Sequence, residues 1–127
     1  MAKTHRFGRY AERLALFLLI LKGYRLRHRN WRGGGGEIDL VMKSGKDIVF
    51  VEVKARSGDA FGGAVGALNA AKRRKLTQAA SAYLSCFGLW DSGCRFDLVT
   101  VESGGSIVPW RLRHYKNAFQ PDRGRQM

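Results

Sequence analysis

Acidic residues are scarce in this sequence: 10 Asp and Glu stand against 23 Lys and Arg, which gives a net charge of +13 over 127 residues. Such a one-sided excess points to a polyanionic partner, nucleic acid first and an anionic membrane second. The acids are also unevenly placed, because residues 33–71 carry five acids and four bases, whereas residues 1–32 carry one acid and nine bases. Acids gathered inside a basic chain indicate a metal site within a phosphate-binding surface, and the alternative is a solvated surface with ordinary acids.

Cysteines and long apolar runs are also scarce. The two cysteines, Cys86 and Cys94, have a spacing that fits no zinc pattern, and the three scattered histidines do not complete one. Two free thiols in a reducing compartment are therefore expected. The apolar run from Leu14 to Leu21 is far shorter than the ~20 residues that a membrane-spanning helix needs, and no small-residue cleavage site follows it. We expect a cytoplasmic protein without a membrane segment.

The length fits one compact domain, residues 1–127, with loose ends at about 1–7 and 120–127. A hairpin turn is expected at residues 44–47, and the strand after it is apolar on both faces, which is typical of a central strand. Periodicity, caps and turn residues together predict helix, three strands, helix, strand and strand, at about residues 9–22, 24–31, 37–42, 48–54, 69–85, 95–101 and 107–112. This order predicts a mixed α/β fold.

Two carboxylates and a lysine are expected to converge in this fold. Side chains alternate along a strand, so Glu52 and Lys54 point to one face, and the hairpin brings Asp39 beside them. One or two carboxylates suffice to hold Mg²⁺, which keeps several waters, and the carbonyl of Val53 could add a further ligand. Lys54 could neutralise charge on a phosphate or orient an attacking water. The alternative is an ordinary salt-bridge set on an exposed sheet face.

At these residues the sequence resembles the restriction-endonuclease-like nucleases, whose signature is matched by Asp39, twelve intervening residues, and Glu52-x-Lys54. More narrowly, the stretch from about Gly8 to Phe119 is similar to the YraN family of small bacterial proteins, regarded as predicted endonucleases related to archaeal Holliday-junction resolvases. The resemblance implies a restriction-endonuclease-like α/β fold, in which a mixed β-sheet is flanked by helices in the order α-β-β-β-α-β-β. It also implies that Asp39 and Glu52 bind the metal and that Lys54 is the catalytic lysine.

The resemblance further marks Glu12, in the first helix, as an extra acid that completes the site in resolvase-type relatives. The alternative is a first-turn acid that stabilises the helix dipole. Trp31 could stack on an unpaired base, although a partly buried core aromatic is the favoured interpretation. Basic residues expected to contact backbone phosphates, without reading sequence, are Arg25, Arg27, Arg29, Arg56, Lys72 and Arg73.

The sequence thus predicts an endonuclease that uses Mg²⁺ or Mn²⁺ to hydrolyse phosphodiester bonds of nucleic acid, with branched or structured DNA as the favoured substrate. DNA and RNA both remain open at this stage. Cutting of branched DNA would imply a symmetric homodimer with two sites. The first alternative is a catalytically inactive nucleic-acid-binding module of the same fold. A membrane-surface role is disfavoured, because the first helix has no cationic face beyond Leu14.

Overall fold

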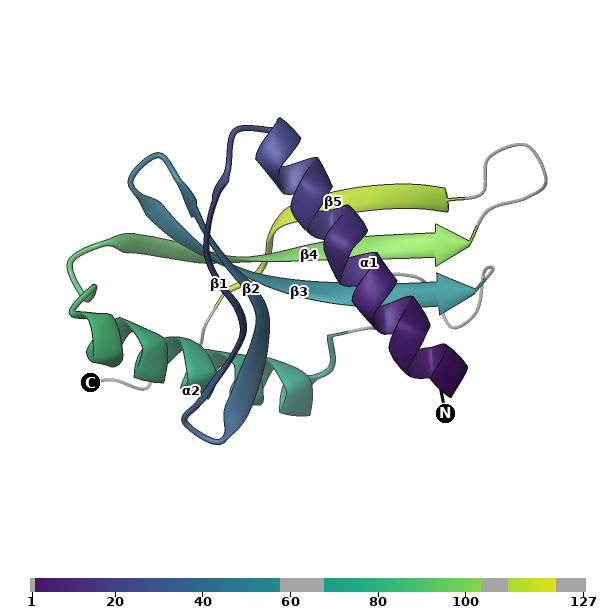
Figure 1. The fold of residues 1–127 in the computed structure, drawn as a ribbon. Helices are drawn as coiled ribbons and strands as arrows, with labels where there is room; N and C mark the ends of the chain where they lie inside the picture. The colour runs from purple at the N-terminus through teal and green to yellow at the C-terminus, as the bar shows by residue number, and fades with distance from the viewer. Residues whose placement is uncertain (1, 58–67, 104–109, 121–127) are drawn as a thin grey trace.

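The computed structural model describes residues 2–57, 68–103 and 110–120 (Figure 1). The predicted order of elements is confirmed, and the fold is α/β with a mixed sheet flanked by two helices, as in restriction-endonuclease-like proteins. The elements in chain order are α1 (Ala2–Leu21), β1 (Arg25–Gly33), β2 (Gly36–Ser44), β3 (Asp47–Ser57), α2 (Ala70–Phe87), β4 (Gly93–Ser103) and β5 (Trp110–Phe119).

The five strands form one sheet in sequence order, β1-β2-β3-β4-β5. Neighbouring strands are antiparallel except β3 and β4, which are parallel and are connected through α2. A parallel pair requires such a crossover, because the chain must return to the same end of the sheet. The apolar strand β3 therefore lies at the centre of the sheet, as its sequence predicts.

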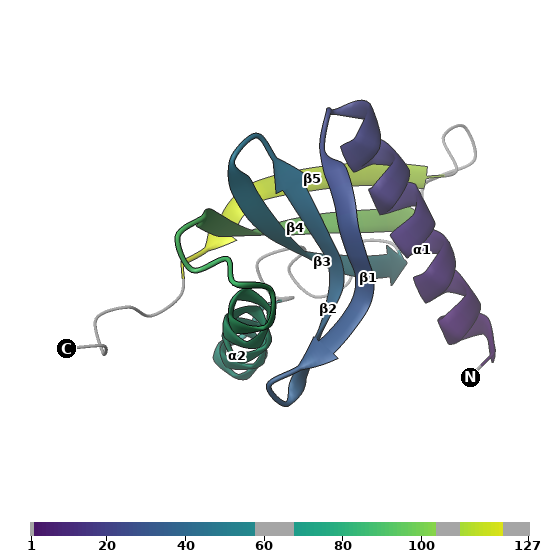
Figure 2. The same cartoon turned by 60° about the vertical axis from the view of Figure 1, so that its left-hand side comes forward.

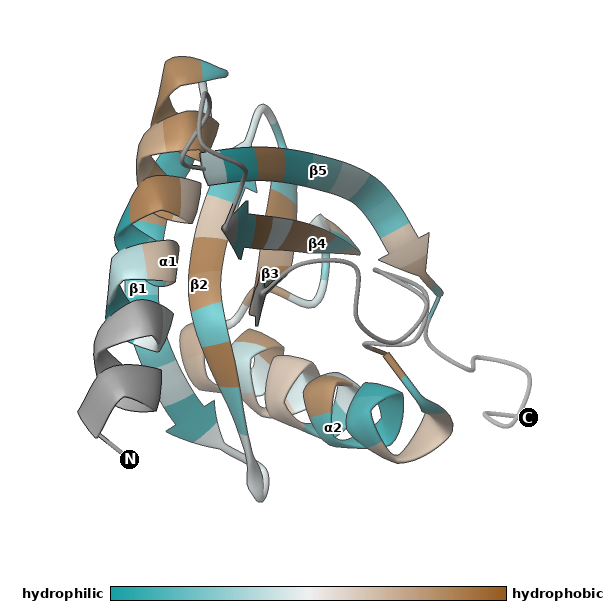
Figure 3. Ribbon diagram, turned by 90° about the vertical axis from the view of Figure 1, so that its right-hand side faces the viewer, coloured by the Kyte–Doolittle hydropathy of each residue, from teal (hydrophilic) through white to brown (hydrophobic). Residues whose placement is uncertain are grey.

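One helix covers each face of the sheet (Figure 2). On the α2 face, side chains such as Ile38, Phe50 and Tyr83 form one core, whereas Leu40, Val51 and others pack against α1 in a second core. Hydrophobic residues are concentrated in α1 and in the inner strands, whereas the edge strands β1 and β5 are largely hydrophilic (Figure 3). The predicted core face of the second helix is confirmed in full by the burial of Leu76, Ala79, Ala80, Tyr83 and Leu84.

Two predicted boundaries are wrong. The first helix begins at Ala2 rather than near residue 9, so residues 2–7 are helical and not a loose end. They include no proline, and adding a turn to an existing helix fixes one residue per hydrogen bond, which costs little. The last strand is β5, which begins at Trp110 and runs to Phe119, beyond the predicted end at residue 112. Its pairing with β4 sustains a polar sequence that carries a weak strand signal by itself.

The glycine-rich turn between β1 and β2 lies directly against α2. Gly34 has φ +61°, and a Cβ there would lie 2.6 Å from the carbonyl oxygen of Gln78. At Gly36 a Cβ would lie 2.7 Å from the carbonyl oxygen of Lys75. The absence of side chains thus allows the backbone of the hairpin to approach the helix backbone, and this contact fixes where α2 lies over the sheet.

In the part of the chain that the structure describes, no helix has both the length and the apolar character needed to cross a membrane. Cys86 and Cys94 are not joined by a disulfide bond, as expected.

Candidate active site

The acidic residue Asp39 lies where β2 and β3 begin to separate. Backbone pairing between these strands extends to Leu40 opposite Val51, and beyond that pair Asp39 Oδ2 accepts a hydrogen bond from the Val53 N–H at 2.8 Å. Ile38 packs on the α2 face and Leu40 on the α1 face, although residues two apart on a regular strand share a face. The alternation of side chains between the two faces is therefore broken at Asp39. Here the carboxylate accepts the Val53 N–H in place of a backbone carbonyl of β2.

The second carboxylate, Glu52, is 4% exposed and is held between two lysines. The Nζ atom of Lys72, in the first turn of α2, lies 3.0 Å from Glu52 Oε2, and the Nζ atom of Lys54 lies 3.7 Å from the same oxygen. The predicted alternation of Glu52 and Lys54 on one strand face is thus confirmed. Burial lowers the pKa of Lys72, but attraction and hydrogen bonding to Glu52 outweigh it, so the net effect raises that pKa. Lys72 therefore remains an ammonium ion that neutralises Glu52.

The carboxyl group of Asp39 has no such cationic partner among the described residues. Burial and the adjacent charge of Glu52 raise its pKa to about 8, and the hydrogen bond from the Val53 N–H offsets only part of this. A hydrogen bond between the Asp39 and Glu52 carboxyl groups contributes to the rise, because it requires a proton on one of them. The two acids thus share one buried environment but are neutralised differently, Glu52 by lysines and Asp39 by a proton.

Glu12 extends this acidic cluster from α1. Burial raises the pKa of Glu12, while a hydrogen bond with Asn30 and the charge of Arg29 lower it in part. The negative charges of Glu12 and Glu52 act on each other, and that of Glu12 also raises the pKa of Asp39, so Glu12 lies within electrostatic range of both. Because α1 begins at Ala2, Glu12 is not a first-turn acid, and the alternative based on the helix dipole is wrong.

Asn30, which hydrogen-bonds to Glu12, belongs to the resemblance to the YraN family but was given no role from the sequence. It adopts φ +51°, a left-handed conformation that asparagine tolerates better than most residues. Asparagine is unfavourable in a regular strand, so its occurrence just before the glycine turn could have marked an irregular backbone position.

The donor set fits a hard divalent cation. Among the described residues no group of three His, Cys, Asp or Glu side chains has a metal-binding arrangement. Asp39 and Glu52, together with Lys54 and Lys72, form a partly buried cluster that we call the acidic recess. Its two carboxylates nevertheless meet the needs of Mg²⁺, which takes oxygen ligands and retains several waters. Asp39 and Glu52 would hold the ion, and Val53, whose N–H is engaged by Asp39, would offer its carbonyl. A bound cation would also relieve the repulsion that raises the pKa of Asp39.

The predicted phosphate-binding residues fall into different environments. Arg27 does not point to solvent, because a register shift between Leu26 and His28 breaks the alternation of β1. Its Nε atom donates a hydrogen bond to the Tyr83 hydroxyl at 2.8 Å, and its guanidinium lies over the rings of Tyr83 and Phe87. These contacts give Arg27 a packing role against α2, and its binding of phosphate stays a prediction.

Arg25, Arg29 and Arg73 are exposed, as a phosphate-binding role requires. Lys72 faces Glu52 rather than open solvent, so it belongs to the acidic site. The backbone of Arg56 lies in β3, but its side chain is outside the described residues. The predicted helix cap is confirmed, because Asn69 Oδ1 accepts a hydrogen bond from the Lys72 N–H at 2.8 Å.

Trp31 is a partly buried core aromatic, as favoured from the sequence. Its ring contacts that of Tyr83 edge to face, with 5.1 Å between centroids, and it packs against the core on the α2 face. It is therefore unsuited to stacking on a base.

A further buried carboxylate, Asp97, serves the fold rather than the site. It accepts hydrogen bonds from Arg95 Nε at 3.0 Å, from the Asn117 N–H at 2.9 Å and from His114 Nε2 at 2.7 Å. Burial raises the pKa of Asp97, but these partners outweigh burial and lower it overall. The network joins β4 to β5 and, through Lys22 and His114, to the end of α1.

The fold and the acidic recess together define a small α/β protein with restriction-endonuclease-like architecture and a site of two carboxylates and two lysines beside the middle of its central strand. The chain belongs to the uncharacterised protein family UPF0102, whose model matches residues 11–101, and this confirms the resemblance to the YraN family.

Relatives in this family come from several bacteria. A UPF0102 protein of Nitratidesulfovibrio vulgaris (strain DP4) is 42% identical over 115 residues, covering 91% of this chain and 84% of that protein. One from Stutzerimonas stutzeri (strain A1501) is 41% identical over 121 residues, covering 94% and 99%. One from Phocaeicola vulgatus is 36% identical over 121 residues, covering 95% and 98%. The span of this chain that the family model matches, residues 11–101, includes Glu12, Asp39 and Glu52.

Proposed function

We propose that this protein is a metal-dependent endonuclease that hydrolyses phosphodiester bonds of nucleic acid, with DNA as the favoured substrate. The observation that supports it best is the pair of carboxyl groups, Asp39 and Glu52, kept together in one partly buried place although burial and the adjacent charge of Glu52 raise the pKa of Asp39 to about 8. Such an arrangement opposes folding, and groups with strongly perturbed pKa values cluster at functional sites. The net charge of +13 supplies the attraction to a polyanion.

The residues take distinct roles in this proposal. Asp39 and Glu52 hold Mg²⁺ or Mn²⁺, which when bound would polarise a phosphoryl oxygen and acidify a coordinated water. Lys54 is 29% exposed at the rim, where its ammonium can neutralise charge that develops on the phosphate. Glu12 adds negative charge beside Asp39 and strengthens the attraction of the recess for a cation.

The alternative is a nucleic-acid-binding module of the same fold without turnover. It is favoured by one observation, the neutralisation of Glu52 by two lysines. In that case Lys72 and Lys54 would serve the fold, and binding of nucleic acid would survive loss of Asp39.

A cleavage assay separates the two functions. Wild-type protein is incubated with supercoiled plasmid, single-stranded DNA and a four-way junction, in Mg²⁺, Mn²⁺ or EDTA. Asp39→Asn and Lys54→Met are compared with Asp91→Asn and Lys43→Met, which make the same substitutions at exposed positions away from the recess. Metal-dependent cutting that the first pair abolishes and the second pair retains supports the endonuclease. Binding without cutting in any metal, unchanged by Asp39→Asn, supports the module.

The same assay addresses assembly. Symmetrical cutting of the four-way junction needs two sites, so it predicts a homodimer, which sedimentation of the bound protein would detect.

A further inference from the structure

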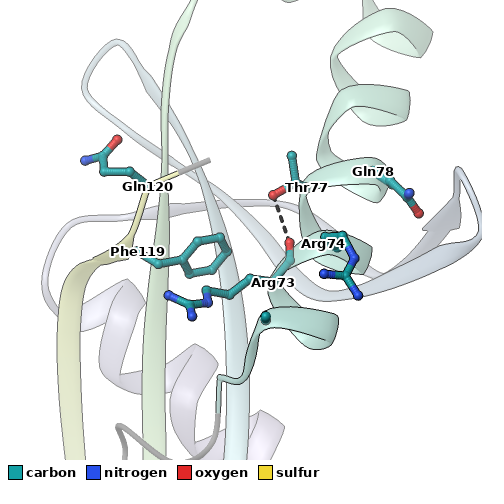
Figure 4. A pocket seen from close by; sticks show the side chains of 7 residues that line it. Arg73, Arg74, Thr77, Gln78, Phe119 and Gln120 are labelled. Carbon is teal, nitrogen blue, oxygen red and sulfur yellow. Dashed lines mark hydrogen bonds between the residues drawn. The ribbon is translucent and has the colours of Figure 1, made fainter. Parts of the chain in front are cut away.

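A groove runs between the first half of α2 and the end of β5. It consists of two adjoining pockets that share Arg73 and Phe119, and we call it the α2–β5 groove. The larger pocket, of about 650 Å³, lies between α2 and the chain end of β5, and Arg73 extends from the helix towards Phe119 (Figure 4). The smaller pocket, of about 350 Å³, lies between Arg73 and the side chains of β4 and β5. The smaller volume matches the lower end of ligand-binding pockets.

The smaller pocket combines an apolar floor with a polar rim. Its floor includes Leu68, Leu98 and Phe119, which are 9%, 2% and 8% exposed. Tyr115 also lines it, and this ring is 36% exposed although it is large and hydrophobic. A flat, mostly apolar group that enters from solvent would therefore meet an apolar surface and the face or edge of a tyrosine ring.

The rim of the groove is cationic. Arg73, Arg74 and Lys116 line it, and none of the lining residues that the structure describes is acidic. Within the described residues these three side chains form no ion pair, so their charge is available to an external anion. An apolar floor for a ring with cations around it is the chemistry that recognises a nucleotide.

The base of that nucleotide must be unpaired. In a duplex the bases are stacked inside the helix, so a protein surface reaches only their edges and the phosphates. A ring can enter the smaller pocket only from a single-stranded segment, where base and backbone can occupy different parts of a groove.

The groove adjoins the acidic recess through α2. Lys72 projects to Glu52, whereas the next residue, Arg73, lines both pockets of the groove. Successive residues of a helix point about 100° apart, so one helical turn presents one cation to each place. A strand whose phosphate lies at the recess can therefore continue past the start of α2 into the groove.

We propose that the α2–β5 groove binds an unpaired nucleotide next to the bond that is cut, so that the substrate is a nucleic acid with a single-stranded segment, such as a fork, flap or gap. This inference rests on the proposed endonuclease function and specifies its substrate class. Because the groove would lie on one side of the scissile bond, the substrate needs unpaired nucleotides on that side only.

The test measures binding in EDTA, where no cleavage occurs. Fluorescence anisotropy compares a single-stranded oligonucleotide with a blunt duplex of the same sequence, for wild type, Tyr115→Ala and Tyr115→Phe. We expect Tyr115→Ala to weaken binding of the single strand about tenfold and to leave the duplex unchanged, because one stacked base is lost. Tyr115→Phe keeps the ring and should bind as the wild type does, with thermal unfolding confirming that both variants fold.

The cationic rim is tested by salt dependence. Arg73→Gln/Lys116→Gln is compared with Lys43→Gln/Lys46→Gln, which removes the same charge at the exposed β2–β3 hairpin. The groove variant should lower the slope of log affinity against log salt for the single strand by about 1.4, since each phosphate contact contributes about 0.7, and the hairpin variant should change it little.

The groove inference is overturned if Tyr115→Ala weakens single strand and duplex equally or not at all, or if the two double variants behave alike. If the wild type cleaves DNA in Mg²⁺ while the binding experiments give those results, the proposed endonuclease function stands and the proposed role of the groove is wrong. Selective single-strand binding without cleavage would support the groove and count against the endonuclease.

Discussion

Replacing Asp39 by asparagine is expected to stabilise the metal-free protein at neutral pH. The amide oxygen of asparagine can still accept the hydrogen bond from the Val53 N–H, and its NH₂ group can donate to Glu52 without a shared proton. The substitution therefore preserves the local contacts and removes the need to hold a proton on a buried carboxyl group when the chain folds. A residue that a fold needs for stability would give the opposite result.

The magnitude follows from the pKa of Asp39, which rises from an ordinary value of 3.8 to about 8 in the folded state. Above pH 4 the unfolded chain ionises Asp39 while the folded chain keeps it neutral, so stability is present below the unfolded pKa and falls as the pH rises towards 8. Each pH unit costs the wild type about 1.4 kcal/mol, which sets a ceiling of roughly 4 kcal/mol at pH 7. Burial of the asparagine amide reduces the expected gain to about 1–3 kcal/mol.

Urea unfolding in EDTA at a series of pH values from 4 to 8 measures this difference. The difference in free energy of unfolding between Asp39→Asn and wild type should be small at pH 4 and should grow with pH. At pH 7 the melting temperature of Asp39→Asn should exceed that of the wild type by about 3–5 °C for each kcal/mol of this difference. Asp91→Asn removes a carboxylate at an exposed position and should produce no such trend. A less stable Asp39→Asn at pH 7, or a difference that does not depend on pH, would refute the reasoning that repulsion and burial raise this pKa.

Three further predictions concern the cation, the buried acid Asp97 and the glycine turn. Mn²⁺ should raise the melting temperature of the wild type saturably, by the equivalent of about 2.7 kcal/mol at a hundredfold excess over its Kd, and Asp39→Asn or Glu52→Gln should remove most of this shift in differential scanning fluorimetry. Because its hydrogen-bond partners lower the pKa of Asp97, this residue stabilises the fold above its unfolded pKa of about 3.9, and the stabilisation is lost as the pH falls through the folded pKa. Asp97→Asn should therefore lower the free energy of unfolding in urea by about 3 kcal/mol at pH 7 and by less in acid. Gly34→Ala should cost more than about 2 kcal/mol and exceed Gly45→Ala, because both have φ +61° but a Cβ at Gly45 meets nothing within 4 Å; equal costs would show that close packing on α2 is unimportant.

Local patterns predict those parts of the site that neighbouring segments build. Alternation along one strand and a tight hairpin suffice to bring Glu52 and Lys54 to the same face and Asp39 beside them, because both effects act over a few residues. The cap at Asn69 likewise fixes the start of α2 and hence the phase of its buried face. The strand alternation, the hairpin and the helix cap are each determined by a few neighbouring residues, so they can be predicted from the sequence.

The features that local patterns miss depend on contacts distant in sequence. Arg27 was predicted to face solvent, but the register shift in β1 turns it towards Tyr83, 56 residues away. The approach of Lys72 to Glu52 depends on how closely α2 can lie over the sheet, and Gly34 and Gly36 set that distance through their contacts with the helix backbone. No spacing in the sequence reveals such an approach, because it depends on the absence of two side chains on a different element.

This long-range contact changes the chemical interpretation of the site. The sequence treats Asp39 and Glu52 as equivalent metal ligands, whereas the structure neutralises Glu52 with lysines and Asp39 with a proton. Under the proposed function a divalent cation must therefore replace a proton at Asp39 and compete with Lys72 at Glu52. A phosphate that approaches the recess offers Lys72 another anion, so nucleic acid and cation should each favour binding of the other. The basic surface and the acidic recess then act as one site, in which the lysine from α2 couples the two ligands.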